Sequence, residues 1–272
     1  MDNAPPSDFL RNVEYSTGRQ RWRPPWLWRF LLRLSRVLIP MFCRLRVTGD
    51  IPDKVRDSAM VLVSNHIGPF DPFVLIAACA RRGLYPRFLA TAGLFRTPVF
   101  GSVMRGCGHI QVDRGTHTVT EALHRAIEAL DEGSCVVVYP EGGITLDPGM
   151  WPQRGKTGAA RLSLASKAPV HVVAQWGAHE VMAWDRPGLM VGTLVTALFR
   201  RPVARVHFGT TVSLDDLDAA TPHAARRATD RIMDACVETL IPLRDNEPVL
   251  PRRIDPVRPL STAHTHRRPG TP

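Results

Sequence analysis

The chain of 272 residues is long enough for one sizeable α/β core or two small domains, and its apolar content of 44% is ordinary for a globular protein. Its 35 Lys and Arg residues against 25 Asp and Glu give a formal net charge of +10, which favours a nucleic acid, an anionic membrane surface or a phosphorylated substrate as partner. The five cysteines are scattered, odd in number and form no Cys-x-x-Cys pair, which argues against a disulfide scaffold and a structural zinc site.

The first residues of the chain lack a basic start followed by an apolar stretch and a small-residue cleavage site. We therefore expect no secretory signal and a location on the cytoplasmic side.

Residues 26–39 form a predicted amphipathic helix, which we expect Pro40 to end. Three arginines fall on one narrow face, opposite a broad face of Trp, Leu and Val. The stretch is too short and too charged to span a bilayer, but the pattern favours a helix lying among anionic lipid headgroups. The expected membrane contacts are Trp22, Trp26, Trp28, Arg29, Arg33 and Arg36. The alternative is a helix packed on the core with solvated arginines.

A histidine and an aspartate follow the strand-like run 59–63 on one short loop. His66 and Asp71 are close enough in sequence for the carboxylate to hold one ring nitrogen, which would make the other a general base. Asp71 also precedes Pro72, as an aspartate does when it caps a helix. Both interpretations are compatible, because a capping carboxylate has a fixed position from which to orient a histidine.

Strand-like and helix-like segments alternate through the rest of the chain. The predicted strands are residues 61–63, 87–90, 109–112, 135–139, 170–174 and 203–208. The predicted helices are residues 72–81, 97–106, 118–133, 158–166 and 221–240. This alternation predicts an α/β fold with a mostly parallel central sheet flanked by helices.

Composition divides the chain into three parts. Residues 1–46 are the basic, aromatic, membrane-associating segment, and residues 47–245 are the main domain. Residues 246–272 are rich in Pro and Arg with few apolar anchors, and are expected to be a disordered tail.

Two further loops at predicted strand ends carry polar residues. Arg114 follows the strand at 109–112, and Glu141 with Gly142 and Gly143 follows the strand at 135–139. Because the carboxyl ends of parallel strands meet at one edge of a sheet, we expect these loops to share a site with the His66 loop. An arginine there can bind a phosphate through two hydrogen bonds. Taken alone, the same residues also fit a solvated arginine and a plain turn.

Together these segments resemble the glycerophospholipid acyltransferase family, whose best-known members acylate lysophosphatidic acid. The four matching blocks are Asn65, His66 and Asp71; Gly108, Ile110 and Arg114; Pro140, Glu141 and Gly142; and residues 168–173. The resemblance covers residues 47–212, and both the order and the spacing of the blocks fit.

The resemblance implies transfer of an acyl chain from acyl-CoA or acyl carrier protein to the hydroxyl of 1-acyl-glycerol-3-phosphate, giving phosphatidic acid without a bound cofactor. It makes His66, oriented by Asp71, the base that deprotonates the hydroxyl. It assigns the acceptor phosphate to Arg114 and the third block, and positioning of the acceptor or the loop to Asn65 and Glu141. No nucleophilic Ser or Cys is required, and the sequence has no Gly-x-Ser-x-Gly motif.

The third block departs from the family pattern, which continues Glu-Gly-Thr-Arg. Gly143 and Ile144 stand in place of Thr and Arg, and isoleucine cannot bind a phosphate. Arg154 and Lys156 precede a predicted helix whose N-terminus also favours anions, so we expect them to supply the missing charge, Lys156 first. The alternative is that both are solvated.

Three other functions remain open. The same chemistry can act on another acceptor: glycerol-3-phosphate, another lysophospholipid or an amino-acid lipid. A basic membrane- or nucleic-acid-binding protein is a second, although no nucleic-acid module is recognisable, and a non-catalytic membrane adaptor is a third.

The histidines lack metal-ligand spacing, so no metal is expected. The favoured prediction is a peripheral or monotopic enzyme on the cytoplasmic face of the membrane, with an acyl thioester donor and a lysophospholipid acceptor.

Overall fold

The computed structural model describes residues 22–112, 118–183, 187–247, 249–251 and 266. Within this part of the chain, the strands form one sheet in the order β1-β7-β6-β2-β5-β3-β4. Neighbouring strands are parallel except β6 and β7, which are antiparallel. The strands are β1 (Arg44–Gly49), β2 (Met60–Ser64), β3 (Pro86–Thr91), β4 (Ile110–Val112), β5 (Cys135–Val138), β6 (Val170–Trp176) and β7 (Val203–Val212). The predicted α/β class with a mostly parallel sheet is confirmed.

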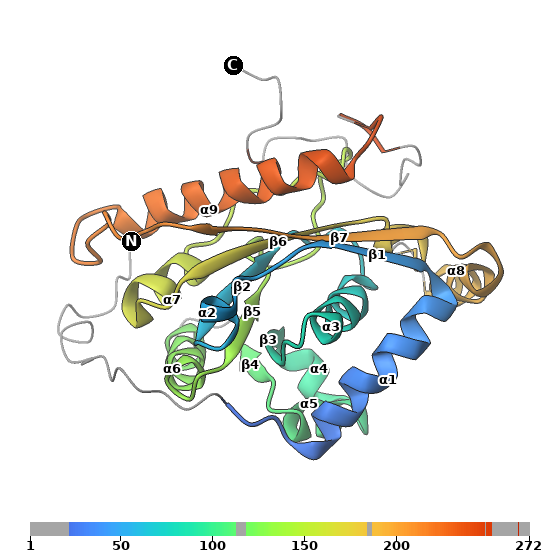
Figure 1. Ribbon diagram of the computed structural model, residues 1–272, viewed down its shortest axis with the longest axis horizontal. Coiled ribbons are helices and arrows are strands. Elements are labelled where there is room, and N and C mark those ends of the chain that lie inside the picture. The colour runs from blue at the N-terminus through green and yellow to red at the C-terminus, as the bar shows by residue number, and fades with distance from the viewer. Residues whose placement is uncertain (1–21, 113–117, 184–186, 248, 252–265, 267–272) are drawn as a thin grey trace.

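Helices cover both faces of this sheet (Figure 1). The α-helices are α1 (Trp26–Phe42), α2 (Asp53–Arg56), α3 (Asp71–Arg81), α4 (Ala92–Arg96), α5 (Phe100–Gly106), α6 (Thr118–Asp131), α7 (Gly158–Ser166), α8 (Pro187–Arg200) and α9 (Ala224–Leu240). The described residues also form short 3-10 helices at η2 (Ala178–Glu180) and η3 (Ile241–Leu243).

The sheet is buried on both faces because successive side chains of its central strands point into two different hydrophobic cores. Met60 and Leu62 of β2 join the core under α1 and α3, whereas Val61 and Val63 join the core under α6, α7 and α9. All five residues of β2 are buried. The uninterrupted apolar runs that the sequence shows are therefore the runs expected of strands covered on two sides.

Helix α1 runs through Pro40 to Phe42, so the prediction that Pro40 ends it is wrong. Proline lacks only its own N–H, and at the last turn this removes a single intrahelical bond. The exposed carbonyl of Pro40 instead accepts two hydrogen bonds from the Arg201 guanidinium, at 2.8 and 3.2 Å.

The N-terminal segment and the tail are joined to the domain more closely than composition indicates. The predicted boundary after residue 46 falls inside β1, which pairs with β7. At the other end, the carbonyl of Val249 accepts the indole N–H of Trp151 at 2.9 Å, and His266 bonds Asp234 at 2.9 Å. The remainder of the predicted tail lies outside the described residues.

The part of the chain that the structure describes contains no helix that is both long and apolar enough to cross a membrane.

Candidate active site

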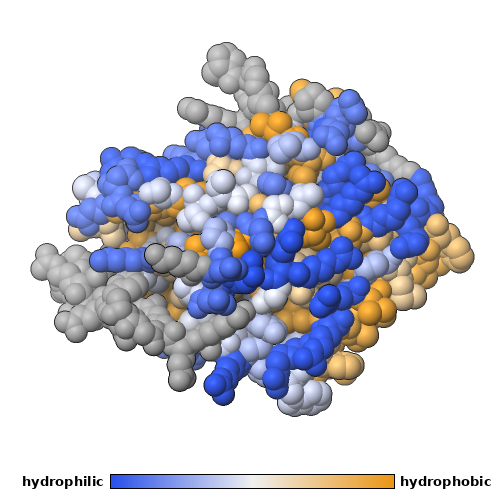
Figure 2. Space-filling view, in the orientation of Figure 1, coloured by the Kyte–Doolittle hydropathy of each residue, from blue (hydrophilic) through white to orange (hydrophobic). Residues whose placement is uncertain are grey.

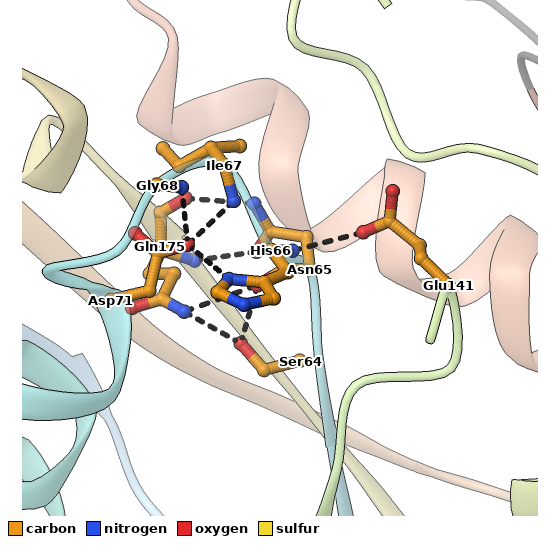
Figure 3. Close-up of polar contacts among 8 residues, drawn as sticks. All are labelled: Ser64, Asn65, His66, Ile67, Gly68, Asp71, Glu141 and Gln175. Carbon is orange, nitrogen blue, oxygen red and sulfur yellow. Dashed lines mark hydrogen bonds and ion pairs between the residues drawn. The ribbon is translucent and has the colours of Figure 1, made fainter. Parts of the chain in front are cut away.

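The candidate site lies where β2 and β5 end and the chain turns into α3 (Figure 3). Ser64 is the last residue of β2, and Asn65 follows it at the edge of the sheet. His66 lies on the loop that then leads to the start of α3. The loop after β5 carries Glu141 to the same place. Two of the three predicted loops therefore meet. Arg114 of the third predicted loop lies outside the described residues.

His66 and Asp71 form a hydrogen-bonded pair. The imidazole Nδ1 lies 2.8 Å from Asp71 Oδ2, the Asp71 side chain is fully buried, and the His66 side chain is 15% exposed. A carboxylate on Nδ1 fixes the tautomer that leaves Nε2 as the acceptor of a proton. The pair therefore has the geometry of a general base that a carboxylate orients through Nδ1.

Asp71 does not cap the next helix as the sequence led us to expect. It is the first residue of α3, the N-cap position belongs to Phe70, and no side chain caps that helix. The carboxylate turns back instead, and its Oδ2 accepts the backbone N–H groups of Ile67 and Gly68 at 2.5 and 2.9 Å (Figure 3). Asp71 therefore holds both the His66 imidazole and the backbone of the loop on which His66 lies. A carboxylate bonded to the N-terminus of α3 would not make these contacts with the loop.

Asn65 ties the His66 loop to the neighbouring strand β6. Its side-chain N–H donates to the carbonyl of Gln175 at 3.0 Å, and its Oδ1 accepts the Gln175 backbone N–H at 2.9 Å. The Gln175 amide donates in turn to the carbonyl of Asn65 and to Ser64 Oγ, at 3.1 and 3.3 Å. Asn65 is 1% exposed, so its place is in positioning the loop rather than in contacting an acceptor.

Glu141 joins the His66 loop to a second loop. Its two carboxylate oxygens accept the backbone N–H of His66 at 2.9 Å and that of Gln153 at 2.8 Å. The side chain is 5% exposed, which makes it a buried acceptor for two backbone donors. Of the two roles expected for Glu141, the geometry supports positioning of the loop.

Tyr139 packs flat against His66, with ring centroids 4.2 Å apart and an interplanar angle of 20°. Burial, and after it the Asp71 charge, raises the pKa of Tyr139 well above its usual value, so the phenol stays neutral. An aromatic face next to the ring limits its rotation and is a favourable neighbour for the imidazolium that proton transfer creates.

Lys156 lies over the glycine of the third block. Gly142 has a positive φ of 72°, and a Cβ on it would stand 2.8 Å from the Lys156 ammonium nitrogen. The backbone N–H of Lys156 donates to the carbonyl of Pro140 at 2.8 Å, which holds the two loops together. An ammonium group therefore lies beside Gly142. Arg154 is exposed, and Gly143 has open space around its Cα.

The membrane contacts expected on α1 divide into two groups. Trp28 is 3% exposed and its indole N–H donates to the carbonyl of Pro86 at 3.0 Å, so its assignment as a membrane contact is wrong. Trp22 is half-buried with the Arg87 guanidinium 5.1 Å from its ring. Trp26 is 71% exposed. The exposed residues also include Arg29, Arg33 and Arg36.

Sequence reasoning missed two residues of the site. Tyr139 stands directly before the third block, and Gln175 is a buried polar residue at the end of the apolar strand β6. A buried polar side chain requires hydrogen-bond partners, so a glutamine within the apolar run of β6 was the sequence signal that could have identified Gln175. The described residues contain no group of three or more His, Cys, Asp or Glu side chains placed to hold a metal ion.

Comparisons with known proteins agree with this geometry. Residues 44–176 match the family model described as Acyltransferase, from β1 to the end of β6. A comparison with curated proteins finds no match. Among solved structures, the 1-acyl-sn-glycerophosphate (LPA) acyltransferase PlsC from Thermotoga maritima is similar, with a TM-score of 0.55 and 18% identity over 78% of this chain and 80% of that one. At this identity the likeness is one of fold. Residues 44–176, which include His66, Asp71 and Glu141, match the acyltransferase family, and the chain has the fold seen in the PlsC structure.

Proposed function

We propose that the protein transfers a fatty acyl chain from acyl-CoA or acyl carrier protein to the hydroxyl of 1-acyl-glycerol-3-phosphate. The observation that carries this proposal is the His66 Nδ1 to Asp71 Oδ2 contact of 2.8 Å within an acyltransferase-family domain. His66 Nε2 takes the hydroxyl proton as the oxygen attacks the thioester carbonyl. The C–S bond breaks, the imidazolium returns the proton to the departing thiolate, and an ester and a free thiol result.

Lys156 supports a phosphorylated acceptor. Its ammonium group lies over Gly142, in the block where the family pattern has an arginine, and Lys156 is an exposed residue. A lysine offers a point charge rather than a two-pronged fork, so it suits a phosphate monoester without demanding one orientation. Glycerol-3-phosphate and other lysophospholipids are the second candidates, because Ile144 replaces the usual arginine.

A thiol-release assay with a panel of acceptors tests both parts. His66→Gln should lower kcat by about 10²- to 10⁴-fold, the usual contribution of a general base. Lys156→Met should raise KM for a phosphorylated acceptor about tenfold or more, with a smaller change in kcat. The reason is that the lysine charge binds the acceptor phosphate equally in the bound substrate and in the transition state. The matched controls are His223→Asn and Lys167→Met. Both residues are exposed and lie outside the loops that carry His66 and Glu141.

Equal thiol release by the parent protein and His66→Gln would overturn the base. An unchanged KM in Lys156→Met across every phosphorylated acceptor would remove Lys156 from the site. A preference for an unphosphorylated acceptor would leave the chemistry in place and correct the substrate.

The proposed setting is the cytoplasmic face of an anionic membrane, where the protein is peripheral or monotopic. Support comes from α1, whose exposed side carries Trp26 and Phe30 next to a row of arginines. Aromatic side chains beside cationic ones are typical of helices that lie in the headgroup region.

A further inference from the structure

Helix α8 exposes an apolar face. It links β6 to β7, and its sequence from Pro187 to Phe199 contains no charged residue. The exposed large side chains are Leu189, Val191, Val195, Leu198 and Phe199, the last of them 83% exposed. Helical spacing puts Val191, Val195, Leu198 and Phe199 side by side, opposite buried Ala197. A helix on the surface of a soluble domain normally carries polar side chains there, and a helix without them usually contacts another apolar phase.

This face continues onto α1. The two helices pack against each other, and Arg201, just beyond α8, holds the carbonyl of Pro40. Trp26, Phe30, Val37 and Met41 form the exposed apolar stripe of α1. Figure 2 shows the apolar colour gathered on the side of the molecule where Figure 1 draws α1 and α8.

A row of arginines borders the apolar stripe. Arg29, Arg33 and Arg36 are exposed, and helical spacing places them along one edge of the stripe. Arg200 adds an exposed charge at the end of α8. Apolar side chains bordered by cations are typical of a surface that binds an anionic bilayer. The apolar side chains enter the boundary of the acyl region, and the guanidinium groups bind lipid phosphates. A second copy of this chain fits less well, since a symmetric contact would bring two rows of arginines together.

The position of α8 connects this surface with the candidate site. Strands β2 and β6 are parallel, with Ser64 beside Val173, so both end at the same edge of the sheet. The His66 loop leaves that edge from β2, and α8 follows it from β6. A bilayer in contact with α8 would therefore meet the molecule at the edge where an acyl acceptor has to reach His66.

We propose that α8 is a second membrane-contacting helix, whose apolar face enters an anionic bilayer surface together with the exposed stripe of α1. The inference rests on the proposed function, because it names the surface from which that site takes its lipid acceptor. It extends the membrane contact from the N-terminal segment to a helix some 150 residues later, inserted between β6 and β7.

Site-specific labelling tests the contact directly. All five native cysteines are buried, so a thiol-reactive, environment-sensitive fluorophore can be attached to Val195→Cys on α8 or to the control Ala220→Cys before α9. With vesicles of phosphatidylglycerol and phosphatidylcholine, the label at 195 should shift its emission to the blue and be quenched by lipid-borne nitroxide. The label at 220 should do neither. An unshifted label at 195, whether or not the protein floats with the vesicles, overturns the proposal.

A charge-matched pair of variants gives a second measurement. Val195→Glu/Phe199→Glu and Arg226→Gln/Arg227→Gln both lower the formal net charge by two, the first pair on α8 and the second at the exposed start of α9. Vesicle binding should weaken about tenfold or more in the first and clearly less in the second. Thermal unfolding should be similar in the two, because the replaced α8 side chains are exposed. Equal vesicle binding overturns the proposal, as does a dimeric parent protein that the α8 variant makes monomeric without loss of vesicle binding.

Activity separates this proposal from the proposed function. The α8 variant should retain thiol release with a monomeric, short-chain acceptor and lose it with an acceptor embedded in vesicles. If no acceptor gives thiol release while the label at 195 still enters the bilayer, the proposed function fails and α8 remains a membrane contact.

Discussion

At the scale of single residues, the His66 imidazole is held on two sides. Asp71 Oδ2 lies 2.8 Å from Nδ1, and Tyr139 lies flat against the ring, with the ring centroids 4.2 Å apart. Asp71 is itself fixed by the backbone N–H groups of Ile67 and Gly68. Each support is a short contact within a buried setting, so the ring starts in the orientation that proton transfer requires and little reorganisation precedes the reaction.

Tyr139 provides a test of that support. Tyr139→Leu should lower kcat about three- to tenfold with KM nearly unchanged, because the lost aromatic face stabilises the imidazolium by about 0.5–1.5 kcal/mol. Tyr139→Phe retains the face and should keep most of the activity. Steady-state kinetics of the two variants decide the point: equal losses would assign the effect to the hydroxyl, and a loss confined to KM would contradict a role in orienting His66.

At the scale of elements, α1 is both a core helix and a surface helix. Its inner face buries Trp28, Leu32 and Ile39 against the core shared with α3, while its outer face exposes Trp26 and three arginines. The sequence left core packing and membrane contact as alternatives; the structure shows the core packing, and the membrane contact is our proposal for the exposed face. The two roles belong to opposite faces, so substitutions can separate them.

The tryptophans of α1 make that separation measurable. Trp28→Ala should lower the free energy of unfolding by about 3–5 kcal/mol, since it empties a buried site and removes the hydrogen bond to the Pro86 carbonyl. Trp26→Ala, on the exposed face of the same helix, should change it by about 0.5 kcal/mol or less. Urea unfolding without lipid gives both values. Similar stability of the two variants would mean that Trp28 does not anchor α1.

At the scale of the whole molecule, the fold holds two histidines in their neutral form. Burial, followed by the Arg87 charge, lowers the pKa of His109 to about 4, and burial lowers that of His171 to about 4. The first packs between Trp28 and Phe88, and the second lies in β6 beside Thr211. Neither can take up a proton in the folded state until the pH falls well below neutrality.

The protein should therefore lose stability between about pH 6.5 and pH 4. In this window the unfolded chain binds protons on these histidines that the folded chain does not, so the free energy of unfolding rises with pH and the full value is present above pH 6.5. His171→Gln should reduce the slope by up to about 1.4 kcal/mol per pH unit, whereas His223→Asn, at an exposed position, should leave it unchanged. Urea midpoints from pH 7 to pH 4.5 measure the slope. A slope that His171→Gln leaves intact would contradict the assignment.

Sequence reasoning predicted the fold well wherever the signal was local. The apolar strands, the helix at 158–166 and the alternation of the two were visible in successive residues, as was the order of the four blocks. It missed β1, whose arginines alternate with apolar residues at the edge of the sheet, and α8, whose uniform apolar sequence has no polar face to mark a helical period.

The sequence by itself determined the fold class, the family resemblance and the proximity of His66 to Asp71, because each follows from the type and order of short segments along the chain. Only the tertiary structure decided that the Asp71 carboxylate turns back to its own loop and that Trp28 is buried. It also decided that Glu141 holds the backbone of His66, 75 positions away, and that Gln175 clamps Asn65 from 110 positions away. Such contacts depend on how distant segments pack, since no periodicity in a strand or helix specifies which side chain a buried carboxylate or amide will meet.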